Sequence, residues 1–338
     1  MKTMMKLLAL CLCLALTVLT FAACDTDSPD VSGTEKVDIK TAKIGIIQYI
    51  SHPSLDNCTN GIIKGLTEAG ASRDNITLQI GSDASAGTDC DTYAKNMVAQ
   101  RYDLIFAVAT PAATAAAGAV RDTAIPLVFC SVSDPVAAGL VDSLAAPGGN
   151  ITGTSDVLDL ASQVDLIQAM QPDVKKIGVL YTTSEANSIT QLQNLRDICT
   201  ARNIEVVDSG VQGASDIPAA AAALVGKVDC LNNFTDNNVV NNLSVVLDAA
   251  NGAGIPVYGS EVEQVKNGCL ASMSIDYVEL GRVTGQMGAS VLGGEAAATM
   301  AVKTFSEAVP VINTDMVQAL SLTVPEKYAS AERVTTTK

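Results

Sequence analysis

Short polar loops follow six apolar runs in this sequence, and they carry the residues best suited to holding a small ligand. In the first half they read QYISHPSLD, ATPAA and SVSDP, and in the second half YTTSEANS, FTDNN and GSEVE. They are rich in Ser, Thr, Asn and Asp and contain no Lys or Arg. Several open a predicted helix, whose first backbone N–H groups attract anions. The pattern indicates recognition of a polar ligand through hydrogen bonds.

An amino-acid-like ligand fits the chemistry of these loops. A carboxylate needs backbone N–H groups and a hydroxyl, which Thr110 before Pro111 offers, as does Ser133. An ammonium group needs carboxylates or amide oxygens, and each charge-assisted hydrogen bond contributes roughly 1.5–3 kcal/mol. The candidate ammonium ligands are Asp236, Glu185 and Asp134. The full set of predicted ligand-contacting residues is Gln48, Thr110, Pro111, Ser133, Asp134, Asp156, Glu185, Asn187, Ser188, Thr235, Asp236, Asn237 and Gly259.

Each of these residues also has a purely structural interpretation. Thr235, Asp236 or Ser184 could cap a helix, and Asp134 with Pro135 could form a turn. One residue can serve both purposes, so the sequence leaves both interpretations open.

Catalysis has little support in the sequence. The only histidine, His52, has no nucleophile or orienting partner in its own segment, so we expect it to shape a loop. The GxGxxG, GxxxxGK[ST] and GxSxG motifs are absent. We therefore expect no enzyme and no cofactor.

The six cysteines that follow Cys24 show no metal-binding pattern, because they are widely spaced and form no CxxC. Together with the single histidine, this predicts no metal site. Cys130, Cys230 and Cys269 lie in strand-like runs and are predicted to be buried. Cys58 with Cys90 is the one pair considered for a disulfide.

Apolar β-branched runs alternate with segments of helical periodicity through both halves. The first half opens this pattern at Lys43 with KIGIIQY, and the second half repeats it at Lys176 with KIGVLY. Such alternation predicts an α/β fold of βαβ units with parallel sheets. The duplication predicts two doubly wound, Rossmann-like lobes of about five or six strands each. We also expect a turn leading into a helix over DPVAAGLV, which begins at Asp134. Ligands of such sheets bind beyond the carboxyl ends of the strands.

The N-terminus has the features of a secretory signal. Lys2 and Lys6 precede an apolar run, which is shorter than the roughly 20 residues of a spanning helix. Phe21-Ala22-Ala23-Cys24 resembles a bacterial lipobox, in which Cys24 becomes the lipid attachment site; an ordinary signal peptide is the alternative. A polar segment suited to a flexible tether follows. This predicts an extracytoplasmic protein anchored to the cell membrane by lipid.

Length and charge limit the remaining possibilities. A chain of 338 residues favours two domains. Its formal charge of −15 disfavours nucleic acid as a partner.

The body of the chain resembles the bacterial ABC-transporter substrate-binding proteins of the tryptophan/tyrosine-binding type. The matching segments cover nearly all of residues 43–328 and include DLIFAVATPAA, IPLVFCSVSDPVAAGLV, PGGNITGTSD, KKIGVLYTTSEANS, FTDN and SIDYVELGR. The resemblance implies a periplasmic-binding-protein type I fold with a three-stranded hinge. It also implies binding of an aromatic or similar amino acid by hinge closure. A permease and its ATPase would be the partners, and we expect a monomer.

The resemblance also implies a domain organisation. It comprises a signal peptide (1–23), a lipidated cysteine and tether (24–42), a first lobe (43–155 plus 277–305), a second lobe (156–276 plus 306–330) and a C-terminal tail (331–338). Asn232 and Asn233 depart from the family pattern, because an apolar strand end is more common there. Tyr49, Tyr181 and Tyr258 could form the wall for an aromatic ring or belong to the core.

Two alternatives remain open. The chain could be a surface receptor or adhesin of the same fold, for which the tether leaves room. It could also bind another small solute, such as a sugar or nucleoside, although the absence of Trp removes the best stacking surface for a sugar.

Overall fold

The computed structural model describes residues 36–337. The predicted signal peptide, the lipid attachment site Cys24 and most of the predicted tether lie outside the described residues. No helix among the described residues is both long enough and apolar enough to cross a membrane.

The first sheet has six parallel strands in the order β11-β5-β4-β3-β1-β2. Its strands are β1 (Ile44–Gln48), β2 (Ile76–Ile80), β3 (Leu104–Val108), β4 (Leu127–Cys130), β5 (Ile151–Asp156) and β11 (Lys303–Phe305). Every residue of β1, β3 and β4 is buried, because these strands are covered on both faces.

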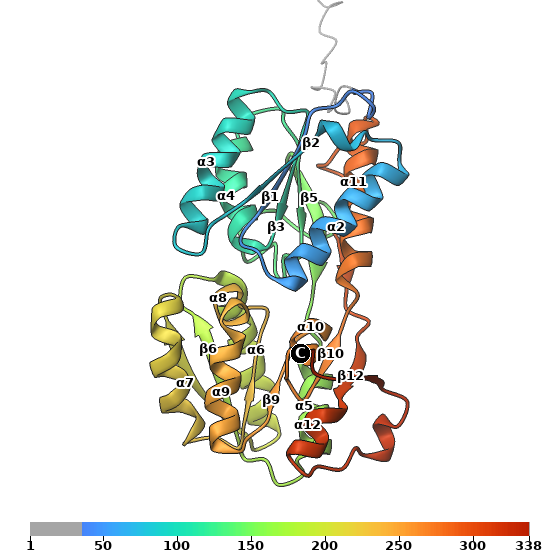
Figure 1. Ribbon diagram of the computed structural model, residues 1–338. Coiled ribbons are helices and arrows are strands. Elements are labelled where there is room, and N and C mark those ends of the chain that lie inside the picture. Colours follow the sequence, from blue (N-terminus) through green and yellow to red (C-terminus); the bar gives the residue numbers. More distant parts are fainter. Residues whose placement is uncertain (1–35, 338) are drawn as a thin grey trace, which may run out of the picture. The chain divides into compact units, whose positions relative to one another are not determined.

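Helices cover both faces of this sheet (Figure 1). They are α2 (Pro53–Glu68), α3 (Ala86–Ala99), α4 (Thr110–Val120) and α11 (Tyr277–Leu292), with a 3₁₀ turn at Arg73–Asn75. Helices α2 and α11 pack on one face and α3 and α4 on the other. Gly61 and Gly281 let α2 and α11 approach closely, because a Cβ at either position would collide with the backbone of the facing helix.

The second sheet has seven strands in the order β13-β12-β10-β9-β8-β6-β7. Its strands are β6 (Lys176–Thr182), β7 (Glu205–Val211), β8 (Cys230–Asn232), β9 (Val257–Tyr258), β10 (Ala271–Ser274), β12 (Val309–Asn313) and β13 (Glu332–Val334). Only β10 with β12 is antiparallel among its pairs.

Helices also cover the second sheet on both faces (Figure 1). They are α5 (Leu160–Met170), α6 (Ala186–Ala201), α7 (Ile217–Val225), α8 (Asn237–Asn241), α9 (Leu243–Ala253), α10 (Val262–Lys266) and α12 (Thr314–Ala319), with 3₁₀ turns at Ala214–Asp216 and Glu326–Tyr328. Helices α5 and α6 share one apolar cluster, and α7 and α9 share another.

The two sheets repeat one topology, which confirms the predicted duplication. Strands β2-β1-β3-β4-β5 of the first sheet correspond in order to β7-β6-β8-β9-β10 of the second. Sheets of this order bind ligands where the strand order reverses, beyond the carboxyl ends of the strands. The chain passes between the sheets after β5, after β10 and between β11 and β12.

One local prediction was wrong, and two details of the fold go beyond what was predicted. The segment after Asp134 forms turns and no helix, with Gly139 at a φ of 68°. The second sheet is mixed, because β12 returns from the first sheet and enters antiparallel to β10. The expected C-terminal tail contains β13, which pairs with β12.

Cys58 and Cys90 are free thiols. They cannot meet, because Cys58 packs in the cluster formed by α2 and α11 and Cys90 in the cluster on the opposite face of the sheet. Cys130, Cys230 and Cys269 are fully buried, as predicted.

Candidate ligand-binding site

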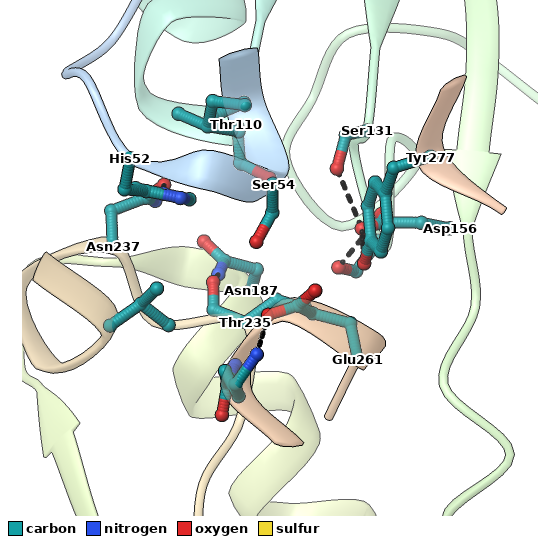
Figure 2. Close-up of a pocket in the computed structure, with 15 residues that line it drawn as sticks. His52, Ser54, Thr110, Ser131, Asp156, Asn187, Thr235, Asn237, Glu261 and Tyr277 are labelled. Carbon is teal, nitrogen blue, oxygen red and sulfur yellow. Dashed lines mark hydrogen bonds between the residues drawn. The ribbon is translucent and has the colours of Figure 1, made fainter. Parts of the chain in front are cut away.

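A cavity with an empty volume of about 350 Å³ lies where loops of the two lobes meet (Figure 2). Polar side chains from both lobes line this space together with a few apolar ones, which is the usual composition of a small-molecule site. The lining residues are His52, Ser54, Leu55, Ala109, Thr110, Ser131, Ser133, Asp156, Asn187, Thr235, Asn237, Val240, Glu261, Gln264 and Tyr277.

Two strained residues shape the first-lobe side of this cavity. Ala109 precedes α4 with φ 81° and ψ 153°, a region that is essentially restricted to glycine. Ser131, directly after β4, has a φ of 57°. Neither is a glycine, and such conformations cost about 1–3 kcal/mol each. Both residues line the cavity, and no side chain caps the start of α4 there.

Asp156 is a buried carboxylate on the cavity wall at the end of β5. It accepts hydrogen bonds from Ser131 Oγ at 2.7 Å, Ser133 Oγ at 3.1 Å and Tyr277 Oη at 3.1 Å. Figure 2 shows Ser131 and Tyr277 beside Asp156. Burial raises the pKa of its carboxyl, and the three hydroxyl donors act in the opposite direction. Among residues 36–337, no Lys, Arg or His side chain forms an ion pair with Asp156.

Glu261 provides a second buried carboxylate, from the loop after β9. It caps α10 by accepting hydrogen bonds from the backbone N–H groups of Glu263 and Gln264 at 2.6 and 2.8 Å. Burial raises the pKa of Glu261 to about 7. Its carboxyl is therefore partly protonated near neutral pH, and a bound cation would favour its ionised form.

Hydrogen bonds join the lobes at the edges of this cavity. His52 Nε2 lies 3.3 Å from Asn237 Oδ1, and Gln191 Nε2 donates to Ser133 Oγ at 3.1 Å. Burial lowers the pKa of His52 to about 4, so the ring is neutral at physiological pH. The second ring nitrogen of His52, Nδ1, is buried without a partner.

Six of the thirteen predicted residues come together on the wall of the cavity. They are Thr110, Ser133, Asp156, Asn187, Thr235 and Asn237. The other seven lie outside it: Gln48, Pro111, Asp134, Glu185, Ser188, Asp236 and Gly259.

Among the seven residues outside the cavity, Asp236 has the clearest structural role, because protein donors already occupy both of its carboxylate oxygens. Its two oxygens accept from Thr182 N at 2.5 Å, Thr182 Oγ1 at 2.8 Å, Ser188 Oγ at 2.7 Å and Val239 N at 3.0 Å. The helix-cap interpretation of Asp236 is thus present in the structure. Ser188 is one of its donors.

Glu185 packs behind the wall. It accepts from Asn237 N and Asn237 Nδ2 at 3.2 and 2.7 Å. Burial and the nearby charge of Asp236 raise the pKa of Glu185 to about 8. It therefore positions Asn237, which itself lines the cavity.

The remaining predicted residues have structural contacts. Gln48 Nε2 donates to Ile50 O and Asp56 Oδ1 and so fixes the loop after β1. Asp134 Oδ1 accepts from Ala137 N in the turn. Pro111 lies within the first turn of α4, and the carbonyl of Gly259 accepts from Gln163.

The cavity residues that sequence reasoning missed fall into two groups. His52, Ser54, Ser131 and Glu261 lie in the polar loops already singled out, so residue type within those loops could have identified them. The second group comprises Leu55 and Ala109, which are apolar residues of the same loops, and Val240, Gln264 and Tyr277, which lie outside them. Of these, Tyr277 opens α11 and reaches Asp156 across 121 positions of sequence, which no local pattern predicts. Tyr258, a candidate ring wall, is buried in the second core and donates to Gln171 Oε1.

Residues 36–337 hold no group of three or more His, Cys, Asp or Glu side chains able to bind a metal ion.

Two α/β lobes, one with a parallel and one with a mostly parallel sheet, around a polar cavity define the class of solute-binding proteins with the periplasmic-binding-protein type I fold. Residues 43–334 match the family model for ABC transporter substrate binding proteins, and the chain belongs to this family. It is a substrate-binding component of an ABC transporter and not an enzyme.

Individual relatives cover most of the chain. A tyrosine-binding protein of Clostridioides difficile (strain R20291) is 38% identical over 321 residues, which span 94% of this chain and 92% of the relative. A crystal structure of an ABC domain from Streptococcus pneumonia in complex with L-Trp has a TM-score of 0.83 at 36% identity, covering 87% of this chain and 99% of that one. The ligand-free, open structure of a Clostridium difficile substrate-binding protein with adhesive properties has a TM-score of 0.66 at 35% identity, covering 88% of this chain and 100% of that one.

Proposed function

We propose that the cavity binds an aromatic amino acid as a zwitterion and that the protein delivers it to an ABC permease. The carrying observation is that two buried carboxyls, Asp156 and Glu261, share one enclosed cavity with the uncapped start of α4. A zwitterion carries one charge of each sign, and this wall offers partners for both.

The α-carboxylate is assigned to the start of α4. The helix dipole and free N–H groups favour an anion there. The Thr110 hydroxyl lies on the same wall, and its side chain is buried.

The ammonium group is assigned to Asp156 and Glu261. Figure 2 draws Thr110 at the upper left of the cavity, Asp156 at the right and Glu261 at the lower right. A charge-assisted hydrogen bond to a buried carboxylate contributes about 1.5–3 kcal/mol, enough to govern affinity. Leu55, Val240 and Tyr277 supply apolar surface for a side chain.

The relatives support the aromatic class. One is a tyrosine-binding protein, and another was solved with L-Trp. Each shares more than a third of its residues with this chain over most of its length. The more distant sugar- and polyol-binding structures, at 14–16% identity, share the fold alone.

Hinge closure is the proposed mechanism. The lobes are taken as 43–155 plus 277–305 and 156–276 plus 306–330, with three crossings between them. The interlobe hydrogen bonds of His52 and Gln191 would stabilise the closed form. The higher TM-score to the L-Trp complex than to the open structure, at nearly equal identity, also supports a closed arrangement here. Ligand shifts the equilibrium only by its difference in affinity for the two forms.

The test is a binding screen on protein that begins at Asp25. The protein is tested in a thermal-shift screen of the twenty amino acids, with sugars and nucleosides as controls. Tyrosine or tryptophan should raise its melting temperature by mass action. Calorimetry then gives the affinity. A shift with a sugar or nucleoside and none with any amino acid would reject the proposal.

The cellular setting belongs to the same proposal. A signal peptide over 1–23 and lipid attachment at Cys24 would tether a monomer outside the cytoplasm, beside its permease and ATPase. Metabolic labelling with a palmitate analogue tests this, because Cys24→Ser should abolish the label and release the protein from membranes.

A second role as an adhesin has one supporting observation, the adhesive properties of the Clostridium difficile relative. The test measures how well cells adhere to host surfaces when they lack this protein and when they carry Asp156→Asn. Adhesion that is lost without the protein but kept with Asp156→Asn would separate an adhesive role from ligand transport.

A further inference from the structure

A second, smaller cavity lies in the second lobe beside the main one. It has an empty volume of about 200 Å³. Gln163, Asn232, Asn233 and Ser260 are among the residues that line it. We call it the asparagine chamber, after the two asparagines at the end of β8.

Unused hydrogen-bonding groups mark this chamber. Both polar atoms of Asn233, Oδ1 and Nδ2, are buried without a partner in the protein. Asn232 Nδ2 is likewise unpaired, although Asn232 Oδ1 accepts from Gln163 Nε2 at 3.0 Å. Each asparagine is only 1% exposed.

Such groups are costly. An unpaired buried polar atom costs about 1–3 kcal/mol, and native proteins keep few of them. Asn233 is therefore not explained by the stability of the folded chain alone. An apolar side chain of the same shape would fill the site without the cost.

The chamber is a close neighbour of the main cavity. Asn233 lies two positions before Thr235, and Ser260 lies directly before Glu261; Thr235 and Glu261 line the main cavity. Gln264 belongs to the main wall, and its Nε2 donates to Ser260 Oγ at 2.8 Å and to Phe234 O at 3.3 Å. The Gln264 amide thus lies at the boundary between the two spaces, on a side chain that can change rotamer.

We propose that the asparagine chamber reads a hydroxyl group at the far end of the ligand side chain. A hydroxyl donates one hydrogen bond and accepts up to two, which matches the free oxygen and N–H groups of Asn233 and the free N–H of Asn232. Rotation of Gln264 opens the way from the main cavity. The preferred ligand is then a phenol-bearing amino acid rather than its phenyl analogue.

This inference rests on the proposed function and refines it. Sites built to bind a ligand hydroxyl reject the analogue that lacks it, because their own polar groups are then left unpaired. The chamber would supply that rejection.

The test compares L-tyrosine with L-phenylalanine by calorimetry on the wild type and on Asn233→Leu, which removes both polar atoms but keeps the approximate shape. The wild type should prefer tyrosine by about tenfold or more. The variant should lose most of that preference through weaker tyrosine binding, with phenylalanine affinity nearly unchanged. Asn251→Leu, at an exposed position of α9, is the matched control and should behave as wild type.

Asn233→Ala provides a second variant in case leucine does not fit, and its tyrosine preference should fall as well. A wild type that binds both amino acids equally would overturn the inference and leave the proposed function standing. An unchanged preference in the variants, or an equal loss for both ligands, would also overturn it, since the chamber would then be only structural. A wild type that binds no aromatic amino acid would instead reject the proposed function itself.

Discussion

Asp156 and Asp236 are both buried aspartates at the carboxyl-end loops of their sheets, yet the structure uses them differently. Asp236 accepts two backbone N–H groups and two hydroxyls, all from its own lobe. Asp156 accepts only side-chain hydroxyls, and it faces the cavity. Residue type and burial are the same, so the difference lies in what already satisfies each carboxylate. A saturated carboxylate holds a fold together, whereas one held by rotatable hydroxyls can receive a ligand.

The variant Asp236→Ala should have the largest effect, and it tests whether Asp236 stabilises the fold. It leaves buried donors on Thr182, Ser188 and Val239 without their acceptor, at about 1–3 kcal/mol each. We expect the free energy of unfolding to fall by roughly 3 kcal/mol or more, measured by urea denaturation. A variant that is as stable as wild type but has lost ligand affinity would show that Asp236 belongs to the binding site.

Asp156→Asn tests the ligand-binding role of the second aspartate in this comparison. The amide keeps an acceptor for the hydroxyls but loses the charge, so stability should change by less than about 1 kcal/mol. Affinity for the amino acid should fall by about tenfold to a hundredfold, the value of a charge-assisted hydrogen bond. Calorimetry measures the affinity. Unchanged binding would remove Asp156 from the ammonium site.

The pH dependence of stability sharpens the role of Glu261. Burial raises the pKa of Glu261 from 4.5 to about 7 and, together with the charge of Asp236, that of Glu185 from 4.5 to about 8. A raised pKa contributes stability that is complete below the unfolded value and is lost as pH rises through the folded value. The pKa of His52 is lowered from 6.5 to about 4, so His52 acts in the opposite direction. Its contribution to stability is complete above pH 6.5.

The free energy of unfolding should therefore fall as pH rises from about 4.5 to 8, and His52 offsets part of this fall below pH 6.5. Glu261→Gln should flatten the part of this slope between about pH 4.5 and 7. Asp248→Asn, which changes an exposed carboxyl, should leave it unaltered. Denaturation series at several pH values measure the slope, and one identical in Glu261→Gln and wild type would contradict the buried, protonated state of Glu261.

The smallest expected effect concerns the strain at the cavity. Ala109→Gly removes the Cβ from a conformation suited to glycine, so the protein should gain about 1 kcal/mol of stability. Ala115→Gly, within α4, should instead lose about 0.5–1 kcal/mol. Denaturant midpoints compare the two. If both variants lost stability equally, the backbone at Ala109 would not be strained.

The sequence was sufficient for the architecture and for the neighbourhood of the site. The repeated KIG run at Lys43 and Lys176 predicted two equivalent lobes, because hydrophobic periodicity is a local property of the chain. The same reasoning expected Thr110, Ser133 and Thr235 near one another, since parallel strands bring their carboxyl-end loops together, and all three line the cavity. It also expected a helix after Asp134, where the structure has turns.

Only the tertiary structure decided which polar groups of those loops were still free to bind. Whether Asp236 or Asp156 faces the cavity depends on partners such as Thr182 and Tyr277, which are 54 and 121 positions away in sequence. The orphaned amide of Asn233 likewise becomes visible only when every potential partner has been placed in space. Periodicity and residue type fix the elements locally, but satisfaction of a buried polar group is a property of the packed whole.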